Sequence, residues 1–299
     1  MRRQPFLVID ISSKGIAWAI GQPTVQPKPS PFELLGWGTV DTETPQWDPA
    51  GLAHAIERVL KGVTLTSLPD RASVCLSHPA LSHHRVTTQV DLADEPIMIR
   101  ERDLERLRSL SVTQAMPIDH ELLALEPLGY AGNGFSGVTD PRGLTATRVR
   151  GTFHLITVPL ALRRALGQAL ESLGIELEGL TYRPKALVAG GVLGEGRQQR
   201  SLLVDGDGIV WDLALVDQGR IVEGTTLRWD VKDTEMGDTK QILDNWFVSP
   251  NCPPSRAVIT GRIALVDGMV ERLEQATGVS AVLGRSPWAQ SLGDLSRQV

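Results

Sequence analysis

The sequence predicts an α/β protein made of two similar lobes, with a small α+β unit inserted into the first lobe. Two observations predict the lobes. Residues 202–219 have the pattern of strand, acid, glycine-containing turn and strand, and residues 6–20 repeat this pattern near the N-terminus. A third observation predicts the insert, because residues 83–157 combine alternating strand patterns with one highly charged helix pattern. We therefore expect two hairpins that face each other between the lobes.

The composition is that of a soluble globular protein. The 299 residues are 41% hydrophobic and 22% charged, which suits two modest domains with their own cores. The net charge of −5 comes without a long basic run, so we expect no nucleic-acid partner. No segment approaches the roughly 18 apolar residues of a membrane span, and we expect no signal peptide. Two cysteines, Cys75 and Cys252, form no disulfide framework, which favours the cytoplasm.

The first lobe is expected to take residues 1–80 and 158–198. Buried or alternating apolar runs predict its strands, and apolar residues three and four positions apart predict its helices. Strands are expected at 6–20 (a hairpin), 32–40, 72–77 and 177–182, and helices from Asp48, from Pro159 to the stop at Gly174, and over 185–192.

The insert is expected to take residues 81–157 and the second lobe residues 199–299. In the insert we expect strands at 84–92, 122–130 and 147–157, a helix at 99–110 and a glycine-rich loop at 129–143. After the diagnostic hairpin of the second lobe we expect a helix at 234–247, a strand at 256–260 and a helix at 264–277 closed by Gly278. The residues from Trp288 show no convincing amphipathic helix.

Several residues of the insert carry a resemblance to a known family. They are Pro117, Asp119, Glu121 and Pro127, the loop Asp140-Pro141-Arg142-Gly143, and the strand end His154-Leu155-Ile156-Thr157. With this insert, the layout resembles the actin-like ATPase superfamily and, more narrowly, the bacterial cell-division protein FtsA and its relative PilM of type IV pili. The resemblance covers roughly residues 5–285. It implies an actin-like (ribonuclease H-like) fold with an insert of the FtsA 1C type, the SHS2 domain.

The resemblance also implies a cleft in which two hairpin turns and an adenosine motif hold ATP and Mg²⁺. The first turn of the family, Asp-Ile-Gly-Thr-(Ser/Thr)-Lys, falls on Asp10-Ile11-Ser12-Ser13-Lys14-Gly15, where the glycine is lost and the lysine is displaced by one position. The second, Asp-x-Gly-Gly-Gly-Thr-Thr-Asp, falls on residues 205–212, and the adenosine motif on residues 260–264. The positions matched in this vestigial nucleotide site are Asp10, Ser12, Ser13, Lys14, Asp205, Gly208, Asp212 and Gly261.

The residues that replace the family's glycines suit phosphate poorly. Ile209 and Val210 are β-branched and favour extended backbone over an anion-binding turn. Trp211 stands where a small hydroxyl would point. Asp207 would set a carboxylate against the phosphates, and two like charges about 4 Å apart repel by about 4 kcal/mol at an effective dielectric constant near 20. Arg262 is either a surface or wedging side chain in the adenosine wall or a substitute anion contact.

These changes lead us to expect no catalytic residue and no bound cofactor, with Mg-ATP as the alternative. Asp10 and Asp205 could hold Mg²⁺ through water in an active relative. In this chain we expect them to serve as turn-forming acids that satisfy nearby backbone N–H groups. The neighbouring histidines His78, His83 and His84 do not predict a metal site, because consecutive strand residues point to opposite faces.

A size difference limits what the resemblance implies about partners. Only about 30 residues, 229–259, separate the second hairpin from the adenosine motif, too few for a full 2B subdomain. In FtsA that subdomain is implicated in binding the tail of FtsZ, and a C-terminal amphipathic helix anchors FtsA to the membrane. We therefore expect a cytoplasmic protein that a partner recruits to the inner face of the membrane.

Three functions follow as expectations. The first is a non-catalytic cell-division scaffold that contacts divisome proteins and self-assembles through the insert. The second is a PilM-like adaptor that takes a peptide from a membrane protein of a pilus or secretion system. The third is an active actin-like ATPase, which would need an intact phosphate cradle and a general base. The charged helix at 99–110 is either a solvated, salt-bridged face or a filament contact.

Overall fold

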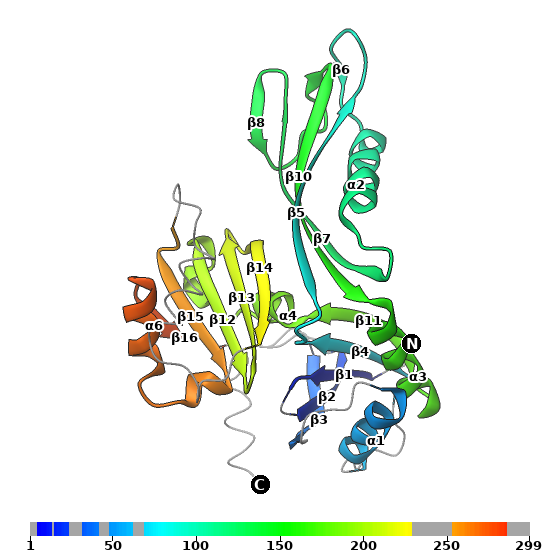
Figure 1. Ribbon diagram of the computed structural model, residues 1–299, viewed down its shortest axis with the longest axis vertical. Helices are drawn as coiled ribbons and strands as arrows, with labels where there is room; N and C mark the ends of the chain where they lie inside the picture. The colour runs from blue at the N-terminus through cyan, green and yellow to red at the C-terminus, as the bar shows by residue number, and fades with distance from the viewer. Residues whose placement is uncertain are drawn as a thin grey trace.

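The computed structural model describes residues 5–13, 15–23, 32–41, 48–61, 69–228 and 253–285. It consists of two lobes side by side, each with a five-stranded sheet, and a third body that rises from the first lobe (Figure 1). Predicted elements that lie outside the described residues are the helix at 234–247 and the segment from Trp288. Most of the gap at 229–259, where we expected no full subdomain, also lies outside them.

The sheet of the first lobe has the strand order β11-β4-β1-β2-β3. Its strands are β1 (Phe6–Ile11), β2 (Gly15–Pro23), β3 (Phe32–Asp41), β4 (Arg71–Leu76) and β11 (Glu176–Tyr182). β1, β4 and β11 run parallel, whereas β2 and β3 are antiparallel to their neighbours. The carboxyl ends of the three parallel strands therefore meet at one edge, which borders the cleft.

Two helices of the first lobe contact each other beside this sheet (Figure 1). They are α1 (Pro49–Leu60) and α3 (Leu160–Ser172). The Asp48 carboxylate caps α1 by accepting from the backbone N–H groups of Ala50 and Gly51. α3 begins after Pro159 and ends before Gly174, which has a φ of +73°. The start of α1 after Asp48 and both ends of α3 confirm the predicted residues.

The insert is a four-stranded sheet of order β5-β10-β7-β8 with one helix packed against it. Its elements are β5 (Ser82–Asp91), β6 (Ile97–Met98), α2 (Glu101–Ala115), β7 (His120–Gly132), β8 (Phe135–Val138), β9 (Thr145–Ala146) and β10 (Arg148–Pro159). Leu104 and Leu107 of α2 pack on Tyr130 and Phe153 of the sheet. Two expectations were wrong here: the helix extends to Ala115, and the glycine-rich stretch contains the strand β8.

The second lobe has the strand order β14-β13-β12-β15-β16. Its elements are β12 (Ser201–Asp207), β13 (Val210–Asp217), β14 (Arg220–Arg228), β15 (Arg256–Gly261), a 3₁₀ turn η2 (Arg262–Leu265), α6 (Met269–Thr277) and β16 (Ala281–Leu283). The helix predicted from residue 264 begins at Met269, because Gly268 has a φ of +73° and interrupts it. Gly278 closes it as predicted.

One continuous hydrophobic cluster joins all three bodies. It contains Ile9 and Leu76 of the first lobe, Ile156 of the insert, and Leu203 and Val216 of the second lobe. The connecting helix α4 (Arg183–Ala189) adds Val188 to the cluster, and a 3₁₀ turn η1 (Gly194–Gln198) leads from it to β12. Burial of apolar surface therefore holds the two hairpins of the cleft against each other.

Candidate functional site

The two hairpin turns of the cleft are tight and joined to each other. In the first turn, the backbone N–H of Ser12 donates to the carbonyl of Gly15 at 3.0 Å, and its hydroxyl reaches the same carbonyl at 3.1 Å. In the second, Asp207 pairs with Val210, so that only Gly208 and Ile209 form the loop. The hydroxyl of Ser13 donates to the carbonyl of Asp207 and links the lobes. Lys14 lies outside the described residues.

A buried arginine occupies the space between the acids of both turns. Arg183 begins α4 directly after β11 and is 8% exposed. Its Nη2 donates to Oδ2 of Asp10 at 2.9 Å, and its Nε lies 3.3 Å from Oδ1 of the same residue. Its Nη1 lies 3.3 Å from Oδ2 of Asp205 and 3.6 Å from Oδ2 of Asp207. One guanidinium therefore meets carboxylates of both lobes.

The electrostatics of this cluster favour a permanently charged arginine. Burial opposes the charge of Arg183, but Asp10 and Asp205 outweigh it, so the pKa of Arg183 lies well above its usual range. Burial raises the pKa of Asp10, and Arg183 offsets part of that rise. Burial and the neighbouring Asp10 also raise the pKa of the Cys75 thiol, which keeps that buried cysteine protonated.

Within the second lobe, the strand β15, which carries the adenosine motif, fixes the carboxylate of Asp205. The hydroxyl of Thr260 donates to Oδ1 of Asp205 at 2.7 Å, which leaves Oδ2 for Arg183. Gly261 follows with a φ of +74°, and a Cβ on it would lie 2.4 Å from the carbonyl oxygen of Gly206. A glycine is therefore needed where β15 passes β12.

Asp212 lies apart from Arg183's ion pairs. It is 1% exposed, and its Oδ1 accepts from the hydroxyl of Thr226 at 2.6 Å. Burial and the nearby Asp205 raise the pKa of Asp212 to about 7, against the opposing effects of Ser77 and Thr226. This carboxyl is therefore only partly ionised at neutral pH.

Two of the expectations for the cleft were wrong. Trp211 does not point toward it but packs in the second lobe's core with Leu213 and Ile263, because alternate residues of β13 face opposite sides of the sheet. Among the described residues, the carboxylates of Asp10 and Asp205 accept from the side chains of Arg183 and Thr260 and not from backbone N–H groups, contrary to the turn-forming role expected for them.

The cleft retains a cavity of about 560 Å³ beside this cluster. It brings together the predicted residues Asp10, Ser12, Asp205 and Gly261, whereas Asp212 does not line it. Arg262 borders the cavity, and its Nε lies 3.1 Å from Oδ1 of Asp207 while about half of its side chain stays exposed. This contact makes Arg262 a partner of an acid in the cleft.

The sequence reasoning missed Arg183 altogether. The helix that Arg183 begins was expected to start at Lys185, which placed Arg183 in the loop between the strand 177–182 and that helix. One signal could have found it: an arginine directly after the strand 176–182 falls at the carboxyl edge that β11, β4 and β1 share. Asp10 stands at the same edge, one residue before the end of β1.

These contacts fit Mg-ATP poorly. Mg²⁺ at the two turns would compete with Arg183 for the carboxylates of Asp10 and Asp205, and a triphosphate would meet the Asp207 carboxylate. Among the described residues, no three or more His, Cys, Asp or Glu side chains converge as a metal site. In the same part of the chain, no helix is long and apolar enough to cross a membrane.

Comparison with known proteins assigns the insert. Residues 78–157 match the family model described as the SHS2 domain inserted in FtsA. The cell-division protein FtsA of Streptococcus pneumoniae is 30% identical over 101 residues, 34% of this chain and 22% of that protein. FtsA of Escherichia coli K12 is 21% identical over 173 residues, 57% of this chain and 41% of that protein. The matches thus span less than half the length of these curated relatives.

Among solved structures, the chain is similar to one from the PilM–PilN type IV pilus biogenesis complex. The TM-score is 0.68 at 15% identity, and the alignment covers 95% of this chain and 88% of the other. At this identity the likeness shows a shared fold. Together with the SHS2 match, it confirms the expected two-lobed architecture with a small insert. This chain thus has the actin-like ATPase fold and contains an SHS2 domain of the kind inserted in FtsA.

Proposed function

We propose that this protein is a cell-division scaffold or adaptor that acts through protein contacts, and that its cleft does not turn over ATP. The FtsA-type insert supports a role in division. The arrangement of charges in the cleft supports a non-catalytic role. A single observation carries the second part: the Arg183 guanidinium lies between the acids of both hairpin turns.

Arg183 supplies the positive charge that a metal ion would otherwise bring. In an active relative, acids at these positions would hold Mg²⁺ through water. Here, binding of Mg-ATP would require Arg183 to leave carboxylates of both lobes, and the buried arginine would need new partners. Nearly complete burial of Arg183 and Asp205 makes this displacement costly.

The backbone of the second turn adds to the case. A phosphate cradle needs several N–H groups that point at the ligand from a glycine-rich loop. In this chain β12 and β13 stay paired up to Asp207 and Val210, and the loop between them contains two residues. The Ser13 hydroxyl also donates a hydrogen bond to the carbonyl of Asp207. We infer that the turn has become a structural hairpin.

Isothermal titration with Mg-ATP tests the non-catalytic role. We expect no binding heat at millimolar nucleotide and no phosphate release above the buffer rate. The same sample must show a cooperative thermal melt, so that the absence of binding heat is a property of the folded protein. Micromolar binding with measurable hydrolysis would refute this part of the proposal.

The tip of the insert is our candidate for partner contacts and self-assembly. Ile97 and Met98 of β6 are exposed, as is Leu144 beside β9. These three residues, here called the tip patch, lie on the part of the insert remote from the first lobe, where β6 is labelled in Figure 1. Exposed apolar side chains that cluster in this way favour protein association.

We propose that the first lobe takes residues 1–80 and 158–198, the insert residues 81–157, and the second lobe residues 199–299.

The structural likeness supports a second candidate, a PilM-like adaptor. The match to a chain of the PilM–PilN complex covers nearly the whole protein. In this alternative a membrane-protein peptide, and not a divisome protein, recruits the chain to the inner face of the membrane. Affinity capture from the native host separates the two: FtsZ or other division proteins favour the first function, and an inner-membrane pilus protein favours the second.

A further inference from the structure

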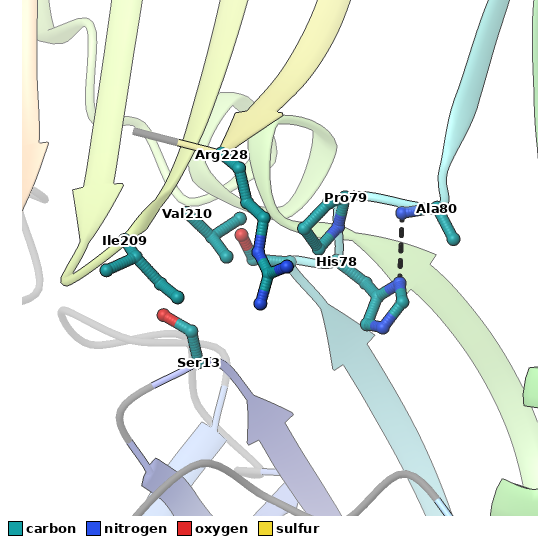
Figure 2. Close-up of a pocket in the computed structure, with 8 residues that line it drawn as sticks. Ser13, His78, Pro79, Ala80, Ile209, Val210 and Arg228 are labelled. Carbon is teal, nitrogen blue, oxygen red and sulfur yellow. Dashed lines mark hydrogen bonds between the residues drawn. The ribbon is translucent and has the colours of Figure 1, made fainter. Parts of the chain in front are cut away.

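A second pocket lies where the three bodies meet. It has a volume of about 390 Å³ and shares no lining residue with the cavity around Arg183. Figure 2 shows its walls: Ser13 from the first hairpin, His78, Pro79 and Ala80 from the segment after β4, and Ile209, Val210 and Arg228 from the second lobe. Ser77 also lines the pocket. The volume falls in the range of small-molecule sites.

Among the described residues that line the pocket, one side chain is cationic and none is acidic. The Arg228 guanidinium, from the end of β14, points into the space between Ser13 and His78 (Figure 2). Within the described ranges, no carboxylate forms an ion pair with Arg228. A guanidinium in this setting favours a planar anion that can accept two hydrogen bonds at once.

His78 adds a neutral imidazole ring next to this cation. Its Nδ1 accepts from the backbone N–H of Ala80 at 3.0 Å, so the ring carries its proton on Nε2. Burial and the charge of Arg228 lower the pKa of His78 to about 4, which keeps the ring neutral at pH 7. The polar side of the pocket thus places the His78 ring and the Ser77 and Ser13 side chains beside the Arg228 charge, and the Ser13 hydroxyl already donates to the carbonyl of Asp207.

The opposite wall is hydrocarbon. Pro79, Ala80, Ile209 and Val210 surround the space, and the lining as a whole is more apolar than polar. An inorganic anion would leave this wall without a partner, whereas an aliphatic chain would bury it. We propose that the pocket binds a small aliphatic carboxylate, with its carboxylate on Arg228 and its chain against Ile209, Val210 and Pro79.

Such a ligand would bridge three parts of the fold. Ser13 and Ser77 belong to the first lobe, His78 to Ala80 lead into the insert, and Ile209, Val210 and Arg228 belong to the second lobe. Binding therefore stabilises the assembled arrangement over any state in which the lobes separate. The inference goes beyond the proposed adaptor role, and it does not depend on whether the Arg183 cavity takes ATP.

Hexanoate, with hexanol and hexylamine as matched probes of the same length, tests the proposal. We expect hexanoate to bind by calorimetry and to raise the melting temperature. The alcohol and the amine should bind at least tenfold more weakly, because the alcohol lacks the negative charge and the protonated amine carries a positive one that Arg228 repels. Affinity should rise from acetate through butyrate to hexanoate, since each buried CH₂ contributes about 0.8 kcal/mol, or roughly fourfold.

Two variants assign the binding to this pocket. Arg228→Gln should weaken hexanoate binding at least tenfold while the melting temperature without ligand stays the same. Arg262→Gln removes an arginine from the other cavity and should bind hexanoate as the wild type does. Equal binding of hexanoate and hexanol, unchanged binding by Arg228→Gln, or no binding of any carboxylate would overturn the proposal. Binding of a peptide C-terminus without binding of free carboxylates would also overturn it.

Discussion

Arg183 and Asp205 belong to different lobes, and their side chains meet 3.3 Å apart in the middle of the cleft. The arginine stands at the carboxyl edge of the first sheet, and the aspartate on the central hairpin of the second. The pair is almost fully buried, and Thr260 fixes the second oxygen of the aspartate. The contact turns a cleft that resembles a nucleotide site into a cross-link between the lobes.

Removal of Arg183 should strongly destabilise the protein. Arg183→Met keeps an apolar stem but leaves Asp10, Asp205 and Asp207 without their shared cation. A buried ion pair that loses one partner costs about 3–5 kcal/mol, so we expect a large fall in the free energy of unfolding. Arg262→Met is the matched control and should cost less than about 1 kcal/mol, because its ion pair is half exposed. Equal losses in urea melts of the two variants would contradict the role given to Arg183.

Asp212 predicts a pH dependence of stability. Its folded-state pKa of about 7 lies above the usual value near 3.8, so its contribution to stability is lost as the pH rises through 7. Asp212→Asn abolishes this titration. We expect the free energy of unfolding of the variant, relative to that of the wild type, to be higher at pH 8 than at pH 5.5 by about 1 kcal/mol or more. Urea melts at both pH values measure the difference, and a difference that does not change with pH would show that Asp212 does not titrate in this range.

Gly261 should tolerate no side chain. In Gly261→Ala the new Cβ would collide with the carbonyl of Gly206, and the positive φ adds strain. We expect a loss of more than about 2 kcal/mol. Gly278→Ala is the control, because it has a similar φ of +71° with open space around the Cβ, and it should cost about 1 kcal/mol. Thermal melts compare the two, and a smaller loss at Gly261 than at Gly278 would be inconsistent with this packing.

The tip patch should matter for association and not for folding. Met98 is 55% exposed, so Met98→Asp should leave the melting temperature within a degree or two but reduce self-association or partner capture. Leu265→Asp, an exposed leucine on the second lobe, should leave association intact. Sedimentation velocity and affinity capture provide the measurements. Loss of association in the Leu265 variant alone would move the interface away from the insert.

The sequence predicted most of the fold because its elements carry local signals. Asp48, Gly174 and Gly278 marked helix ends correctly, and alternating apolar residues marked both hairpins. The strand β8 was missed because its residues, Phe-Ser-Gly-Val, lie in a glycine-rich stretch with little hydrophobic pattern. The start of α6 was misplaced because the tight turn η2 keeps a helix-like spacing up to Gly268.

The candidate site was only half predictable. The acids of the two turns were identified from the hairpin pattern, since each is fixed by its place at a strand end. What they bind depends on a residue that is far away in sequence, because Arg183 is 173 residues from Asp10. Trp211 was misassigned for a related reason: the family motif gave its position, but strand alternation decides its direction.

A crystal structure of the protein grown with excess Mg²⁺ and a non-hydrolysable ATP analogue tests the central claim most directly. We predict that Arg183 keeps its contacts with Asp10 and Asp205 and that no ordered nucleotide lies between the lobes. Ordered triphosphate density cradled by residues 10–15 and 205–212, with Arg183 displaced from the two carboxylates, would contradict it.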